Sequence, residues 1–153
     1  MRLGDILRLA AQRDPHKIAI ISGDWQLTYA AYNAAANRFA HLLVDAGVVH
    51  GDRIATVLFN GPEYGITHFG NARAGSVLVH ISPMYAAPEI ARIVKQTRPR
   101  ILVVDADVAS KIEQVHDQLE SIERIIVVAS NVKDDQFKEA IAAFPETHPN
   151  IDI

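Results

Sequence analysis

Apolar residues recur along this chain with two different periods. Near the N-terminus they are spaced by three and four positions, which predicts a short helix that ends at Asp14-Pro15. The apolar positions of this helix are Leu3, Ile6, Leu7 and Ala10. Residues 17–21 and 25–29 are rich in β-forming side chains and flank Ser22-Gly23-Asp24, a pattern typical of a hairpin.

A second helix is expected from Ala30 to Ala46. Thr28 is placed to cap its first turn, and Gly47 follows where a left-handed C-terminal residue is common. Its apolar stripe consists of Tyr32, Ala35, Phe39, Leu42, Leu43 and Ala46. The spacing predicts that Asn33, Asn37 and Arg38 face away from this stripe.

Four short apolar runs then alternate with four predicted helices. The runs are 54–59, 76–81, 101–104 and 125–129, and the helices are 62–74, 88–97, 108–122 and 136–144. The runs are apolar on both faces, which is typical of central parallel strands. This pattern predicts a three-layer α/β fold, with a mainly parallel sheet between helices and with the N-terminal helix and hairpin in front. Residues 145–153 are polar, contain two prolines and are expected to form an exposed connector.

Composition narrows the possible functions. The 153 residues are 49% hydrophobic and carry a net charge of −3, with acidic and basic residues mixed along the chain. Such a chain lacks the basic face expected of a nucleic-acid-binding protein. There is no cysteine, which excludes disulfides, thiolate metal sites and cysteine nucleophiles. No secretory signal or membrane span is evident, so a cytoplasmic location is expected.

Motifs that bind phosphate or perform catalysis are missing from the sequence. There is no Walker loop, no Gly-x-Gly-x-x-Gly and no Gly-x-Ser-x-Gly. The nearest segment is Asn60-Gly61-Pro62-Glu63, in which Asn60 is expected to cap a helix and Glu63 to reach back in a capping box. His80 lies near the end of an apolar run, where a structural or merely exposed histidine is the expected interpretation.

Asp105 and Asp107 are the sharpest local candidates. Two carboxylates at the end of a parallel strand can bind Mg²⁺, as in response-regulator receivers. The favoured interpretation is that Asp107 caps the next helix while Asp105 is a solvated strand end. A receiver also needs an acidic pair after its first strand and a later lysine, and neither is in place.

Six segments in order resemble the N-terminal pattern of the adenylate-forming superfamily, which includes acyl-CoA and aryl-CoA ligases. The resemblance extends from about Leu3 to Asp105. The segments are Leu27-Thr28-Tyr29-Ala30-Ala31-Tyr32-Asn33, 40–48, 51–55, Phe59-Asn60-Gly61-Pro62-Glu63-Tyr64, 72–77 and 82–90. Where relatives commonly have Val-Pro-Leu-Asn-Pro, this chain has His80 and Ser82 in place of the first proline and the asparagine.

The resemblance implies a function for a longer parent protein. Such enzymes join a carboxylic acid to ATP with Mg²⁺ and then transfer the acyl group to coenzyme A. Their phosphate loop, their adenine and ribose motifs and their C-terminal lysine do not occur here, so no catalytic, cofactor-binding or metal-binding residue is assigned to this chain. The segment 82–85, Ser-Pro-Met-Tyr, favours fatty-acyl and related CoA ligases.

Residues 1–153 are therefore expected to be the N-terminal subdomain of an acid–CoA ligase and an incomplete part of a larger domain. The chain alone is expected to be inactive. Its expected partners are the remainder of the parent enzyme and, in that enzyme, a small carboxylic acid. One alternative is a stand-alone binding or scaffold module that acts through a homodimer or a partner chain. A third hypothesis, a magnesium-dependent domain using Asp105 and Asp107, is the weakest.

Overall fold

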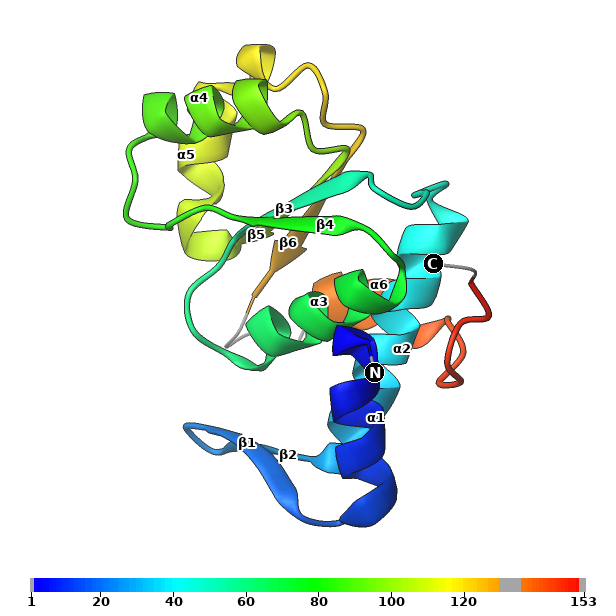
Figure 1. The fold of residues 1–153 in the computed structure, drawn as a ribbon. Helices are drawn as coiled ribbons and strands as arrows, with labels where there is room; N and C mark the ends of the chain where they lie inside the picture. Colours follow the sequence, from blue (N-terminus) through cyan, green and yellow to red (C-terminus); the bar gives the residue numbers. More distant parts are fainter. Residues whose placement is uncertain (1, 130–135, 152–153) are drawn as a thin grey trace.

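The computed structural model describes residues 2–129 and 136–151, and its first elements follow the expected order (Figure 1). Helix α1 (Leu3–Arg13) precedes an antiparallel hairpin of β1 (Ile18–Ser22) and β2 (Trp25–Thr28), and α2 (Tyr29–Asp45) follows. The Thr28 hydroxyl accepts a hydrogen bond from the Ala31 amide at 3.2 Å, so the predicted cap is confirmed.

The main sheet has four parallel strands in the spatial order β4-β3-β5-β6. The strands are β3 (Arg53–Val57), β4 (Val77–His80), β5 (Ile101–Asp105) and β6 (Arg124–Val128). The helices that connect or follow them are α3 (Pro62–Arg73), α4 (Ala87–Thr97), α5 (Ala109–Gln114) and α6 (Gln136–Ala142). Strand and helix thus alternate as the sequence predicted.

Helices cover both faces of this sheet. Figure 1 places α4 and α5 on one side and α2, α3 and α6 on the other. Along β5, Ile101 and Val103 belong to the core beneath α2 and α3, whereas Leu102 and Val104 belong to the core beneath α4 and α5. Successive side chains of a strand point to opposite faces, so both faces are buried. The predicted three-layer architecture is confirmed.

The outer strands depart from the prediction that all four runs lie centrally. Strands β3 and β5 are buried along almost their whole length, but β4 and β6 form the two edges of the sheet. Val77 in β4 is 50% exposed and Ile125 in β6 is 37% exposed. Apolar composition alone does not distinguish a central strand from an edge strand whose outer side is open.

The single helix expected over 108–122 is divided. A 3₁₀ turn, η1 (Ala106–Val108), precedes α5, and a second one, η2 (His116–Gln118), follows it. The prediction of one continuous helix is wrong because its apolar spacing of three and four is also satisfied by 3₁₀ turns. Ile112, Val115 and Leu119 are all buried on the same face despite the break.

The last described residues lie along α2. The Asn37 side chain donates a hydrogen bond to the Glu146 carbonyl at 2.5 Å, and His41 Nε2 lies 2.9 Å from the Thr147 carbonyl oxygen. The side chains of 145–148 are exposed, whereas Pro149 is buried. Within 2–129 and 136–151, no helix is both long enough and apolar enough to cross a membrane.

Candidate functional site

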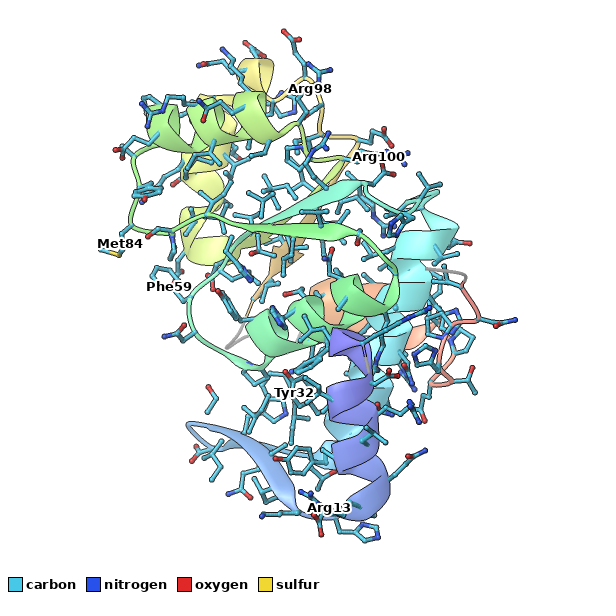
Figure 2. The ribbon with its side chains drawn as sticks, viewed as in Figure 1. Arg13, Tyr32, Phe59, Met84, Arg98 and Arg100 are labelled. Carbon is cyan, nitrogen blue, oxygen red and sulfur yellow. The ribbon has the colours of Figure 1, made fainter. Side chains whose placement is uncertain are left out.

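A cleft of about 650 Å³ opens where β3, β5 and β6 end. Ligands of open parallel sheets commonly bind at the carboxyl ends of the strands. The described residues that line this cleft come from the hairpin turn, the loop after β3 and the ends of β5 and β6; they are 22–25, 59–62, 105–107 and Ala129. Figure 2 shows Phe59 on the loop that leaves β3, beside this end of the sheet. Its position at the carboxyl ends of three parallel strands makes this cleft the candidate site.

The two aspartates at the end of β5 lie in this cleft but have exchanged their expected roles. Asp105 is buried, and its carboxylate accepts a hydrogen bond from the Asp107 amide at 3.1 Å, which caps η1. Asp107 is exposed. The prediction that Asp107 is the cap and Asp105 a solvated strand end is therefore wrong. A tight turn directly after a strand favours the aspartate whose side chain can reach the amide two residues ahead.

The turn before α3 also differs from the predicted capping box. The residue that caps the helix is Gly61, which has an extended backbone and no side-chain cap, while Asn60 is exposed. Proline is favoured at the first helical position, so Pro62 fixes the start of the helix one residue later than a cap at Asn60 requires. Glu63 is buried at the base of this turn. The Asn60 prediction is wrong.

The residues that line the cleft do not fit a nucleoside triphosphate or a divalent cation. Its described lining includes Asp24, Asp105 and Asp107 but no lysine or arginine, so it would repel phosphate. Pro62 removes one of the helix N-terminal amides that an anion would use. Among the described residues there is also no cluster of three or more side chains able to hold a metal ion.

His80 belongs to a cluster of rings at the open edge of the sheet. Its Nδ1 atom lies 2.8 Å from the Thr56 hydroxyl oxygen, and its ring stacks on Tyr64 at a centroid distance of 4.5 Å. The His68 ring lies parallel to it at 6.0 Å. Burial, and secondarily the like charge of His68, lower the pKa of His80 below its ordinary value. The four-residue spacing of Tyr64 and His68 indicates that they share a helix face, but not that this face meets His80.

The most extensive polar cluster was not predicted. Arg73 is 1% exposed, and its guanidinium donates to Asn37 Oδ1 at 2.6 Å, to Asn33 Oδ1 at 2.7 Å and to the Gly4 carbonyl at 3.3 Å. The sequence predicts that Asn33 and Asn37 face away from the apolar stripe of α2, but it does not predict that this second face is also covered. Asn37 is buried, and both side chains accept hydrogen bonds from a buried arginine. Burial lowers the pKa of Arg73 to about 10. The cluster joins α1, α2 and α3.

A family model described as "AMP-binding enzyme" matches residues 7–151. A medium/long-chain-fatty-acid–CoA/3-oxocholest-4-en-26-oate–CoA ligase of Mycolicibacterium smegmatis is 30% identical over 135 residues, which is 88% of this chain and 24% of that protein. The long-chain-fatty-acid–CoA ligase FadD13 of Mycobacterium tuberculosis is 34% identical over 118 residues, or 76% of this chain and 24% of that protein.

Solved structures share this fold over a similar fraction of their own length. A fatty acyl CoA synthetase of Mycobacterium tuberculosis superposes with a TM-score of 0.90 at 28% identity, covering 99% of this chain and 30% of that one. An anthranilate CoA ligase, AuaEII, also gives a TM-score of 0.90, at 24% identity, over 96% of this chain and 29% of that one. The chain thus spans about a quarter of the length of these two curated relatives.

Proposed function

Because this chain belongs to the AMP-binding enzyme family, we propose that it forms the N-terminal part of an ATP-dependent acid–CoA ligase. The proposed ligase forms an acyl-adenylate from a carboxylic acid and ATP with Mg²⁺, and then a thioester with coenzyme A. The observation that carries the proposal is the match of residues 7–151 to the family model, together with the match of most of this chain to about a quarter of fatty-acid–CoA ligases. The substrate we propose is a fatty or related acid, as in the names of these relatives.

In this proposal the described residues are the scaffold of the active site rather than its chemical groups. The acidic cleft lacks cationic side chains in its described lining, which supports the idea that the groups for the phosphates are supplied by other sequence. Residues 145–153 then connect this subdomain to that sequence. Hydrogen bonds from Asn37 and His41 to the carbonyls of Glu146 and Thr147 hold the first part of the connector against α2.

Acid-dependent exchange of pyrophosphate into ATP tests the proposal. The 153-residue chain should show no exchange with any of a panel of fatty and aromatic acids. A polypeptide extended through the downstream reading frame should show exchange with at least one fatty acid. Exchange by the 153-residue chain alone would contradict the scaffold role. A stop codon directly after the codon for Ile153 would contradict the proposal that the chain is part of a ligase.

A second candidate function is a stand-alone binding module of the same fold. The observation that favours it is the uncovered edge of β4, where Val77 is 50% exposed and the sheet ends without a further strand in the described part of the chain. Such a module would act through another copy or a partner chain. It predicts that the chain folds stably alone and never acquires exchange activity when downstream sequence is added.

A further inference from the structure

The open edge of β4 has backbone groups positioned for pairing with another strand. β4 pairs with β3 alone in the described part of the chain, and Figure 1 shows it as an outer strand of the sheet. The amides of Val77 and Ile81 point toward β3. They donate to the carbonyl of Asp52, the residue just before β3, at 2.7 Å and to that of Thr56 within β3 at 2.8 Å. Because orientation alternates along a strand, the amide and carbonyl groups of Leu78 and His80 point away from β3.

This edge carries no charge. Residues 74–88, which include β4 and the loop after it, contain no Asp, Glu, Lys or Arg and form the longest such run in a chain that is 22% charged. Natural edge strands are commonly protected by charges, proline or bulges. Apolar side chains instead flank this one: Val77 is 50%, Met84 78% and Tyr85 42% exposed. Figure 2 shows Met84 projecting outward from the loop after β4.

We propose that the β4 edge is an interface at which two copies of this chain pair antiparallel across a two-fold axis. A surface that meets its own copy brings equal charges together, so an uncharged edge is the kind that can pair with itself. Nothing in the 74–88 run repels a second copy. The pairing joins two four-stranded sheets into one continuous sheet and covers part of the exposed apolar side chains.

The register follows from which edge groups are unoccupied. Ser76 is already engaged, because its amide donates to the Asn71 carbonyl and its carbonyl accepts from the Asn71 side chain. The Ser82 carbonyl is also engaged, since it accepts from the Tyr85 amide. Leu78 and His80 are the edge residues left between them. In the dimer, Leu78 exchanges backbone hydrogen bonds with His80 of the second copy, and His80 does so with Leu78 of that copy. This pairing requires the two copies of Val79 to face each other across the two-fold axis.

This register makes a specific cross-link possible. Two residues opposite each other at a non-hydrogen-bonded position have Cα atoms about 4.5 Å apart, a separation that a disulfide can span. The chain has no cysteine, so a single introduced cysteine has no other partner. Val79→Cys is therefore expected to give a covalent dimer under mild oxidation. Val49→Cys is the matched control, because Val49 is 62% exposed and lies outside the edge.

Sedimentation of the 153-residue chain provides the second measurement. The wild-type chain is expected to form a dimer whose population rises with concentration. Val77→Lys is expected to raise the dissociation constant of this dimer by at least about tenfold, because the change places two like charges in one interface. Val49→Lys adds the same charge elsewhere and should change the constant by less than about twofold. Circular dichroism and thermal melting test whether each variant folds. If Val79→Cys does not fold, the comparison of Val77→Lys with Val49→Lys still tests the interface.

Several outcomes would overturn the proposal. One is a wild-type chain that sediments as a monomer at every concentration, and another is equal cross-linking of the two cysteine variants. Equal effects of the two lysine variants would place the interface elsewhere. A chain that is monomeric alone, but whose Leu78 and His80 amides become protected when downstream ligase sequence is added, would assign the edge to that polypeptide instead. None of these measurements depends on ligase activity.

Discussion

Arg73 is the residue whose removal should most clearly test how the first three helices are held together. Its buried guanidinium donates hydrogen bonds to Gly4 in α1 and to Asn33 and Asn37 in α2. No carboxylate accepts from it among the described residues. The substitution Arg73→Met keeps much of the apolar stem but removes every one of these donors.

The expected loss of stability follows from the acceptors that remain. A buried acceptor left without a donor costs about 1–3 kcal/mol. The side-chain oxygens of Asn37, which is 3% exposed, and of half-buried Asn33 lose their donor, so two acceptors are left unpaired. The Gly4 carbonyl lies within α1 and keeps its helical hydrogen bond. Removing the desolvated charge offsets part of this cost. We expect a net loss of about 3 kcal/mol, which is a large part of a typical stability of about 5–15 kcal/mol.

Urea denaturation measures this loss through the midpoint at unchanged slope. Arg13→Met is the control, since the Arg13 side chain is 78% exposed and its removal should change stability by less than about 0.5 kcal/mol. Arg73→Met should also speed the hydrogen exchange of the α1 amides, because Arg73 attaches α1 to α3 through its hydrogen bonds to the Gly4 carbonyl. Arg73→Lys should recover only part of the loss, because an ammonium lacks the planar fork. Equal midpoints for Arg73→Met and Arg13→Met would refute this reasoning.

Three further expectations can be checked by the same denaturation assay. The pKa of His80 is lowered by burial and by His68, so as pH falls through about 6.5 the unfolded chain takes up a proton that the folded chain resists. Stability is then lost on acidification, and His80→Gln should lose less than wild type between about pH 7.5 and pH 5.5; equal slopes would argue against it. Asp105→Ala should cost about 1 kcal/mol by removing the cap of η1, whereas Asp107→Ala should cost little, and the reverse order would restore the sequence-based assignment. Gly51 has a φ of 86°, so Gly51→Ala should cost about 1 kcal/mol and Gly51→Asn less, and equal midpoints would show that this turn relaxes without strain.

The sequence by itself determined the order and type of most elements. Apolar spacing located α1, α2 and the strands that form the sheet, because a buried face imposes a period of about 3.6 on a helix and leaves a buried strand apolar on both sides. Local stereochemistry also determined Thr28 as the cap of α2 and Gly47, whose φ is 75°, as the residue that ends it. These features depend on a residue and its near neighbours, and the family resemblance rests largely on the same positions.

Only the tertiary structure decided which polar groups meet and which strands lie at the edges. Asn37 receives a hydrogen bond from Arg73, 36 positions away, and donates one to Glu146, 109 positions away. No local pattern contains either partner. Likewise, Val77 and Val103 are both β-branched residues in apolar runs, yet one is 50% exposed and the other fully buried. Spatial order β4-β3-β5-β6 makes that difference, because an edge strand has a neighbour on one side only. The type of a residue determines how strongly its side chain favours burial, but the fold determines whether a neighbour is there to bury it.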